Sequence, residues 1–394
     1  MNENVEEKVE NIEKEYEIIN SFDKMGLKEN LLRGIYSYGF ELPSLIQSKS
    51  IPLIIKGKDL IAQSHSGTGK TGAFTIGTIQ CIKEDVNGCQ AIIIAHTREL
   101  AQQIYDVISN LSQYTKVKAV LCMGGQDIRQ TKKDLDKGPV VIICTPGRLL
   151  DLIKRKFVSM RLVKLLVIDE ADEMLSSSFI EQLKSIIMQI PQNAQICLFS
   201  ATMNTNMLRV TEKFMNNPEK ILIEKENLTL EGIKQFYVKT EKEFWKFETL
   251  CDLYEQISVS QTIIYVNSIR RGEDLKANLE DKQFTVSLIH SNMNINERNK
   301  IMKEFRNGST RILISTDLLS RGIDIQQISV VVNYDIPRNK DCYLHRIGRS
   351  GRFGRKGVAI NLVTRNDERS LNEIKDHYKI DIDPMPMEIQ EFMS

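Results

Sequence analysis

DLIAQSHSGTGKT, residues 59–71, sets the fold class of this chain of 394 residues. An apolar run of strand length, DLIAQS, leads into a loop with two glycines and then into a helical stretch. Gly67 and Gly69 permit backbone conformations that a Cβ would forbid, so successive N–H groups can turn toward an anion. Lys70 adds a positive charge suited to the β- and γ-phosphates of a nucleotide, and the Thr71 hydroxyl is suited to Mg²⁺. The stretch therefore predicts a nucleoside triphosphate site on an α/β sheet.

This loop departs from the strict pattern GxxxxGK[ST] at one position, because Ser64 stands where that pattern has glycine. A chance glycine-rich turn is the alternative interpretation, and the preceding strand and the lack of a following proline disfavour it. A histidine beside a triphosphate is suited to change its charge near neutral pH; the alternative, which we favour for His65, is that its ring faces solvent. The expected nucleotide-binding residues of the loop are Ser64, His65, Ser66, Gly67, Thr68, Gly69, Lys70 and Thr71.

A second apolar run ends in acids, in the stretch LLVIDEADEML at residues 165–175. Asp169 at this strand end is suited to hold the Mg²⁺ that Lys70 and Thr71 require. Glu170 points to the other side, because strand side chains alternate, and it is suited to orient and deprotonate a water. The alternative is that these acids only cap the next helix, and the triphosphate loop makes that less favoured. We expect Asp172 to pair with the SAT stretch at 200–202.

Apolar runs of strand length recur along the chain with helix-length segments between them. Runs that are apolar on both faces indicate parallel strands covered by helices on each side. The alternation breaks at the polar stretch 224–237, so we expect two α/β domains. The expected ranges are an acidic arm at 1–20, a first domain at 21–225, a linker at 226–235 and a second domain at 236–394. The strand runs start at residues 59, 91, 117, 140, 165 and 195 in the first half and at 261, 284, 311, 330 and 358 in the second.

Composition excludes several classes of protein. No apolar run approaches the ~18 residues that span a bilayer, so we expect no membrane association. The first twenty residues hold seven glutamates and two lysines, which is untypical of a secretory or mitochondrial presequence. Seven cysteines form no CxxC pair, which favours a reducing compartment over a zinc or disulfide framework. The charges of 53 basic and 52 acidic side chains nearly cancel, so the net charge does not indicate a partner. Binding partners must be inferred from local clusters of charged residues.

These loops belong to a longer series of motifs. In this order the chain resembles the DEAD-box ATP-dependent RNA helicases, over roughly residues 20–394, and is identified as a member of that family. The resemblance implies two RecA-like domains, each a parallel sheet covered by helices, that close on ATP, Mg²⁺ and RNA. The motifs that carry it are SFDKMGL, GFELPSLIQ, SHSGTGKT, HTREL, Gly124–Gly125, TPGR, DEAD, SAT, IIYVNS, STDLLSRGID and HRIGRSGR.

The resemblance also implies roles for individual residues around ATP. Phe40 stacks on adenine, Gln47 hydrogen-bonds its edge, and Asp324 contacts the ribose. In the cation-rich stretch HRIGRSGRFGRKG at 345–357, Arg349 and Arg352 are the arginine fingers that stabilise charge on the γ-phosphate. Since these arginines belong to the second domain, hydrolysis requires the two domains to close. The expected catalytic residues are Lys70, Asp169, Glu170, Arg349 and Arg352.

RNA contacts follow from the same resemblance. Hydroxyls, backbone amides and arginines suit phosphates and 2′-OH groups, so binding is expected to be independent of sequence and sensitive to salt. Ser200 and Thr202, with Asp172, are expected to couple the ATP and RNA sites, although strand-end hydroxyls often only satisfy the backbone. The expected RNA-binding residues are Thr97, Arg98, Gly125, Thr145, Arg148, Arg298 and Thr316.

The biological role is read from four stretches at 226–238, 317–327, 331–339 and 352–364, which most resemble family members that act in translation initiation. We expect an RNA-stimulated ATPase that unwinds RNA locally in initiation; the alternative is an ATP-dependent clamp that nucleates a ribonucleoprotein complex, as in exon-junction complexes. Expected partners are RNA and protein regulators such as an initiation-factor scaffold. We expect a cytoplasmic monomer, with the nucleus left open. Ser291, Asn292 and Ile295 stand where relatives have Gly, Asp and Gln, which leaves open whether unwinding is weakened while ATP binding stays intact.

Overall fold

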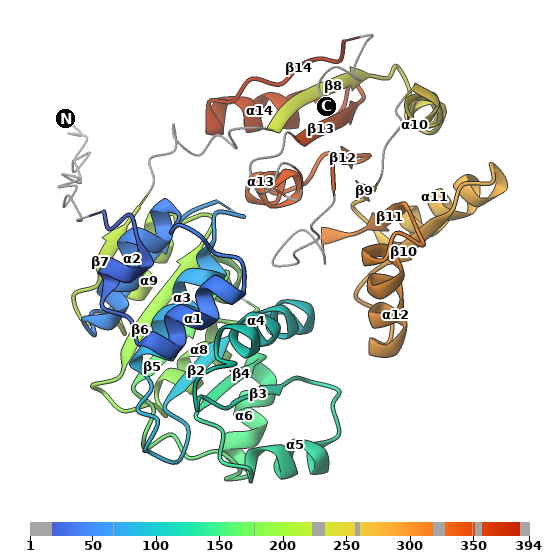
Figure 1. Cartoon of the computed structure of the whole chain (residues 1–394). Helices are drawn as coiled ribbons and strands as arrows, with labels where there is room; N and C mark the ends of the chain where they lie inside the picture. The colour runs from blue at the N-terminus through green and yellow to red at the C-terminus, as the bar shows by residue number, and fades with distance from the viewer. Residues whose placement is uncertain are drawn as a thin grey trace, which may run out of the picture.

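The structure is a computed structural model that describes residues 18–65, 67–176, 178–222, 233–256, 261–317, 328–348, 350 and 357–386. Two seven-stranded sheets, one in each half of the chain, form its framework (Figure 1). Every strand pairing in these residues is parallel. The predicted fold class is therefore confirmed.

The first sheet has the order β3-β4-β2-β5-β6-β1-β7. Alternation along its strands divides their side chains between two cores: in β2, Ile93 packs with one core, and Ile92 and Ile94 pack with the other. The strands are β1 Leu60–Gln63, β2 Ala91–Ile94, β3 Ala119–Cys122, β4 Val141–Cys144, β5 Leu165–Ile168, β6 Gln195–Ser200 and β7 Glu219–Ile221. The helices are α1 Glu29–Ser37, α2 Leu45–Ile55, α3 Lys70–Cys81, α4 Arg98–Leu111, α5 Ile128–Leu135, α6 Pro146–Lys154, α7 Ala171–Met174, α8 Ile180–Ile187 and α9 Thr205–Thr211, after a 3₁₀ turn at Phe22–Met25.

The second sheet has the order β10-β11-β9-β12-β13-β8-β14. Its strands are β8 Ile233–Lys239, β9 Thr262–Tyr265, β10 Val286–Ile289, β11 Ile312–Ser315, β12 Val330–Asn333, β13 Gly357–Val363 and β14 Asp383–Pro384. Its helices are α10 Trp245–Gln256, α11 Ile269–Asp281, α12 Ile295–Arg306, α13 Lys340–Ile347 and α14 Glu368–Tyr378. Each strand run expected from the sequence overlaps one of the strands in the two sheets.

Three strands, β7, β8 and β14, were not expected. β8 begins at Ile233, so residues 233–235 of the expected linker belong to the second sheet, where β8 pairs with β13 over its whole length. The polar residues Lys234 and Gln235 interrupt the apolar pattern from which the other strands were predicted, although Gln235 is buried. Residues 223–232 and the acidic arm up to residue 17 lie outside the described part of the chain.

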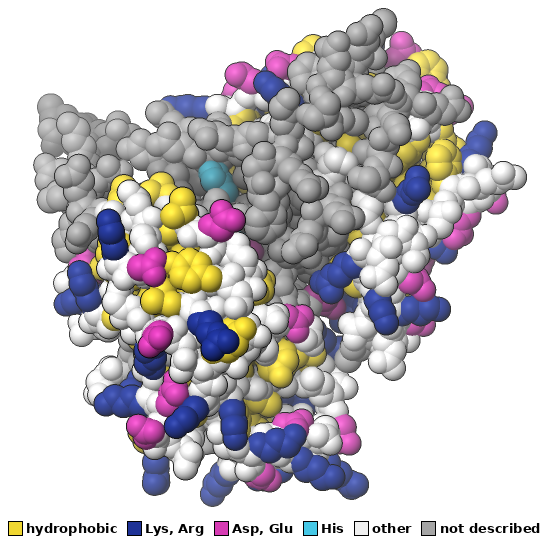
Figure 2. Space-filling model, viewed as in Figure 1, with side chains coloured by type: hydrophobic (Ala, Val, Ile, Leu, Met, Phe, Trp, Pro, Cys, Tyr) yellow, Lys and Arg dark blue, Asp and Glu magenta, His cyan; other side chains and the backbone are white. Residues whose placement is uncertain are grey.

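The surface carries charges of both signs. On the face shown in Figure 2, Lys and Arg side chains are interspersed with Asp and Glu, as the balanced composition requires. None of the described helices is both long and apolar enough to span a membrane.

Candidate active site and nucleic-acid interface

The loop between β1 and α3 has the conformation that its glycines allow. Gly67 and Gly69 have φ of +86° and +97°, which is the left-handed region that other residues avoid. Lys70 begins α3, and its buried Nζ donates to the carbonyl oxygens of Ser64 at 2.5 Å and His65 at 3.1 Å. The backbone N–H groups at this helix start can therefore bind an anion beside a buried cation.

Ser64, which departs from the strict loop pattern, has a structural partner. Its Oγ lies 2.7 Å from Thr68 Oγ1, and Thr68 Oγ1 also donates to His65 O at 2.8 Å. The hydroxyl of Ser64 therefore joins the start of the loop to Thr68 by a hydrogen bond. His65 is half-buried, so it is less exposed to solvent than the sequence predicted. Ser66 lies outside the described residues.

The residues expected around adenine contact this loop directly. Gln47 Nε2 donates to Gly69 O at 3.2 Å, and Gln47 Oε1 accepts from the backbone of Ser44 at 2.9 Å as part of the capping box of α2. A Cβ on Gly72 would lie 3.1 Å from the Phe40 ring, so glycine permits this close approach. Phe40 stacks on the buried Phe22 with ring centroids 6.4 Å apart. The structure thus brings Phe40 and Gln47 to the phosphate loop.

The acids that follow β5 are buried. Asp169, Glu170 and Asp172 are 3–5% exposed. Burial, followed by the charge of Glu170, raises the pKa of Asp169 to about 7, against the opposing effect of Lys70. A divalent cation would favour the ionised form, and carboxylate and hydroxyl oxygens are its preferred ligands, so Asp169 and Thr71 fit Mg²⁺.

Glu170 has an unusual backbone. Its φ of +49° places a non-glycine residue in the left-handed region, directly before α7. Such conformations cost about 1–3 kcal/mol and persist where surrounding structure imposes them, often at active sites. Here the Glu170 N–H donates to Asp169 Oδ1 at 2.9 Å. This hydrogen bond fixes the orientation of the Asp169 carboxylate relative to the Glu170 backbone.

The SAT stretch at the end of β6 bonds to Asp172, as the sequence predicted. Ser200 Oγ accepts from the Asp172 N–H at 3.3 Å, and Thr202 Oγ1 donates to Asp172 Oδ2 at 3.0 Å. The same carboxylate meets the second domain: His345 Nε2, on α13, lies 2.9 Å from Asp172 Oδ2. His345 is fully buried, and its Nδ1 lies 3.9 Å from Glu170 Oε2.

His345 is the residue that sequence reasoning missed. It begins the cation-rich stretch that was assigned to Arg349 and Arg352, and that concentration of positive charge was the available signal. Arg346 next to it is also fully buried and binds Asp317 at 2.6 Å and the Asp335 carbonyl at 2.7 Å, which fixes α13 on the second sheet. The expected residues Asp324, Arg349 and Arg352 lie outside the described residues.

Three arginines of the expected RNA site come together from both domains. Burial lowers the pKa of Arg98, and the neighbouring charges of Arg298 and Arg148 lower it further. Arg298 Nη1 lies 3.0 Å from Glu99 Oε1, and these two side chains are 8% and 10% exposed. Arg148 Nη1 and Arg298 Nε are buried, with no hydrogen-bond partner among the described residues. The cluster therefore offers N–H donors that an anionic phosphate can satisfy.

The remaining expected RNA residues lie at strand ends. Thr97 follows β2 and caps α4 through its side chain. Thr145 Oγ1 accepts from the Gly124 N–H at 3.4 Å, beside Gly125, whose φ is +85°. Thr316 directly follows β11 in the second sheet and is half-buried. Both sheets thus carry hydroxyls and backbone groups at strand ends.

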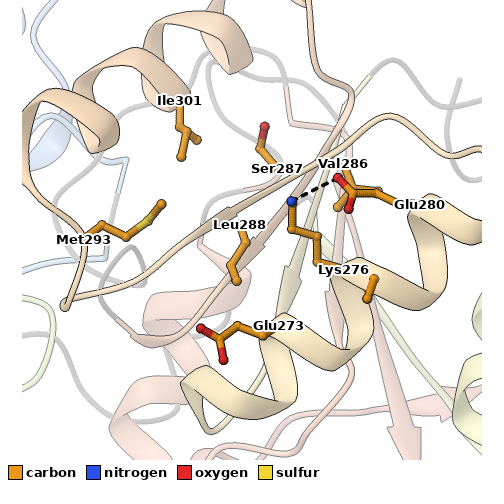
Figure 3. Close-up of a pocket in the computed structure, with 9 residues that line it drawn as sticks. Glu273, Lys276, Glu280, Val286, Ser287, Leu288, Met293 and Ile301 are labelled. Atoms are coloured by element: carbon orange, nitrogen blue, oxygen red, sulfur yellow. Dashed lines mark ion pairs between the residues drawn. The ribbon is translucent and has the colours of Figure 1, made fainter.

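A separate cavity of about 430 Å³ lies in the second domain, at the edge strand β10 (Figure 3). Lys276 and Glu280 form an ion pair of 3.0 Å at its rim. None of the expected site residues belongs to its lining, which is Glu273, Lys276, Ala277, Glu280, Val286, Ser287, Leu288, Met293 and Ile301.

The fold is that of a two-domain enzyme of the RecA-like class, in which His345 of the second domain contacts the buried acids at the edge of the first sheet. The chain matches the sequence model of the DEAD/DEAH box helicases over residues 44–210 and that of the helicase conserved C-terminal domain over residues 245–354. The chain belongs to the DEAD/DEAH box helicase family.

Known relatives resemble the chain over nearly its whole length. It is 51% identical over 383 residues to proteins named ATP-dependent RNA helicase eIF4A from Neosartorya fischeri and Pyricularia oryzae, covering 97% of this chain and 96% and 97% of theirs. The structure of S. cerevisiae Dbp5 bound to RNA and ADP BeF3 is 34% identical with a TM-score of 0.89, covering 95% of this chain and 97% of that one. Mss116 bound to ssRNA and UDP-BeF is 26% identical with a TM-score of 0.86, covering 96% of this chain and 83% of that one.

Proposed function

We propose that this protein is an ATP-dependent RNA helicase that hydrolyses ATP to ADP and phosphate, is stimulated by RNA and unwinds RNA locally during translation initiation. The observation that carries the proposal is the contact of His345 in the second domain with Asp172 of the buried acidic cluster. That contact makes the catalytic acids depend on the position of the second domain, and this dependence is what an enzyme switched by ATP and RNA requires.

In the hydrolytic step, Glu170 accepts a proton from the water whose oxygen attacks the γ-phosphorus. The bond from that phosphorus to the bridging oxygen breaks, and ADP leaves. Lys70 and the loop N–H groups hold the phosphates, while Thr71 and Asp169 hold Mg²⁺. The metal, when bound, neutralises charge on the β- and γ-phosphates.

The other nucleotide contacts keep the roles that the family resemblance implies. Phe40 and Gln47 bind adenine, and their contacts with the phosphate loop support this role. Asp324 binds the ribose, and Arg349 and Arg352 stabilise the charge that builds on the γ-phosphate.

RNA lies across both domains on the face that carries the arginine cluster. The unsatisfied N–H groups of Arg148 and Arg298 support phosphate binding there. Because the binding groups recognise backbone and not base edges, affinity is independent of sequence and falls with salt. Ser200, Thr202 and Asp172 couple this site to the ATP site through their shared hydrogen bonds.

Translation initiation is the role favoured by relatives that bear the name eIF4A at 51% identity. It is favoured over an ATP-dependent clamp for that reason. The proposal includes a cytoplasmic monomer that works with a protein scaffold.

Measurement of ATP hydrolysis with and without single-stranded RNA tests the enzymatic part, with single-stranded DNA as control. We expect single-stranded RNA, but not single-stranded DNA, to accelerate ATP turnover. Equal rates with RNA, with DNA and without nucleic acid would refute the proposal. To test the role, the protein is added to a translation extract depleted of its initiation helicase. It should restore translation of a messenger with a structured leader, and Glu170→Gln should not.

A further inference from the structure

Phe244 and Trp245 form an exposed aromatic pair where α10 begins. Their side chains are 63% and 38% exposed, and the rings meet edge to face with centroids 5.9 Å apart and planes at 87°. Lys242 Nζ lies 5.8 Å from the Phe244 centroid. Figure 2 shows hydrophobic surface in the region of α10. Large aromatic side chains normally lie in a core or an interface, so two in contact at the surface indicate a binding site.

The surroundings favour a nucleic acid as the ligand. Glu243, directly before the pair, is bonded to Arg271 and lies 3.4 Å from Lys246, so its negative charge is compensated. Lys242 and Arg270 are both exposed. Aromatic faces beside cations are the surface on which successive bases of a single strand stack.

A series of ion pairs and hydrogen bonds runs from Glu243, the residue before the aromatic pair, to Arg346. Arg271, the partner of Glu243, lies 2.7 Å from Asp335, and Asp335 accepts from the Asn267 N–H at 2.8 Å. Asn267 Oδ1 in turn accepts from Arg346 at 2.8 Å.

Arg346 also binds Asp317, the neighbour of Thr316. β8 ends at Lys239 and β11 at Ser315, and the pairings that join them across the second sheet are parallel, so the aromatic pair and Thr316 both follow strand ends at the same edge of that sheet. A single strand that leaves the cleft along the second domain can reach the pair.

We propose that Phe244 and Trp245 form a stacking platform for a nucleotide of single-stranded RNA that flanks the segment bound between the domains. The inference rests on the proposed RNA-binding function. Stacking on an aromatic face accepts any base, so the platform adds affinity for longer strands without adding sequence preference. Removing such a contact changes affinity by about fivefold to more than a hundredfold, and we expect the low end because both rings are already partly covered.

Trp245 gives a specific reporter, because it is the only tryptophan in the chain. The full-length protein with ADP–beryllium fluoride is titrated with a short oligouridine that fills the cleft and with oligouridines extended at the 5′ or the 3′ end. We expect an extension at one end to quench tryptophan emission beyond the change caused by the short strand. Emission that responds identically to all three strands would overturn the platform.

Phe244→Ala supplies the affinity test. We expect it to weaken binding of the extended strand about fivefold and to leave the short strand unchanged, and Phe244→Tyr to restore binding. Met188→Ala, which removes an 80% exposed side chain in the first domain, is the matched control. Because Phe244 is mainly exposed, the unfolding midpoint of Phe244→Ala should stay at the wild-type value.

The outcomes separate this inference from the function on which it rests. Failure of both short and extended strands to bind would refute RNA binding itself and the platform with it. Normal binding of both strands to Phe244→Ala would refute the platform alone, including the case in which the variant loses binding to a protein partner.

Discussion

The ion pair between Glu99 on α4 and Arg298 on α12 offers a test in which two interpretations predict opposite signs. The sequence assigned Arg298 to RNA, whereas the structure pairs it with Glu99 across the domains at 3.0 Å. If Arg298 serves only as a phosphate ligand, Glu99→Gln removes a competing negative charge and strengthens RNA binding. If the pair stabilises the closed arrangement, the same substitution weakens RNA binding that depends on ATP.

The expected change in RNA affinity follows from the distance between Glu99 and Arg298 and from the burial of both side chains. Two unit charges at this separation of 3.0 Å attract by roughly 5 kcal/mol at an effective dielectric constant of about 20. Desolvation offsets part of this energy, and truncation of one partner of a buried pair costs about 2–5 kcal/mol. Because the amide introduced by Glu99→Gln keeps a hydrogen-bond acceptor, we expect about 2–3 kcal/mol, which is about 30-fold to 150-fold in affinity.

The assay is fluorescence anisotropy of a labelled single-stranded RNA, with and without ADP–beryllium fluoride. If the pair belongs to the closed arrangement, Glu99→Gln should lower the affinity only when the nucleotide analogue is present. Glu181→Gln is the matched control, because Glu181 pairs with Lys184 at 2.6 Å but both side chains are exposed and such pairs contribute about 0–1 kcal/mol. An RNA affinity that rises, or that falls equally without nucleotide, would refute the closure role.

Three further variants test the nucleotide site. Glu170→Gln should retain ATP and RNA binding but slow phosphate formation by about 10²–10⁴-fold in single-turnover measurements, and unchanged hydrolysis would remove Glu170 as the base. Arg352→Ala should keep the ATP affinity near normal and slow the chemical step by about 10³-fold or more, as followed by nucleotide titration and rapid quench; loss of binding alone would contradict the finger role. Burial raises the pKa of Asp169 from 3.8 to about 7, so its protonated form stabilises the fold and that stabilisation is lost as pH rises through this window. Without nucleotide and Mg²⁺, Asp169→Asn should therefore gain stability relative to wild type as pH rises from about 4 to about 7 in urea unfolding, and an unchanged difference would contradict the assigned pKa.

The sequence predicted the strands well where both faces are buried, because such strands are continuous apolar runs. It missed strands whose side chains are not uniformly apolar: β7 is the short segment Glu219–Ile221, β14 is Asp383–Pro384, and β8 carries Lys234 and Gln235. These strands are held by backbone pairing with neighbours that the local pattern does not reveal, such as the bonds of β8 to β13.

The same distinction applies to the site. The loops after β1, β2, β4, β5 and β6 could be grouped from the sequence because parallel strands bring their carboxyl ends to one edge of the sheet. The pairs Glu99–Arg298 and Asp172–His345 could not be predicted, since the members of the second pair are 173 residues apart and meet only through the placement of one domain on the other. No periodicity carries that information.

Asp172 Oδ2 is a single carboxylate oxygen that contacts residues of both domains. It accepts from Thr202 at the end of β6 and lies 2.9 Å from His345 Nε2 on α13. Movement of the second domain therefore acts on α7, the short helix that Glu170 precedes with its strained φ of +49°. A residue in such a conformation needs its surroundings to hold it there. We infer that the second domain helps to impose the geometry of the catalytic base, so that closure on RNA both brings the arginine fingers to ATP and orients Glu170 toward the attacking water.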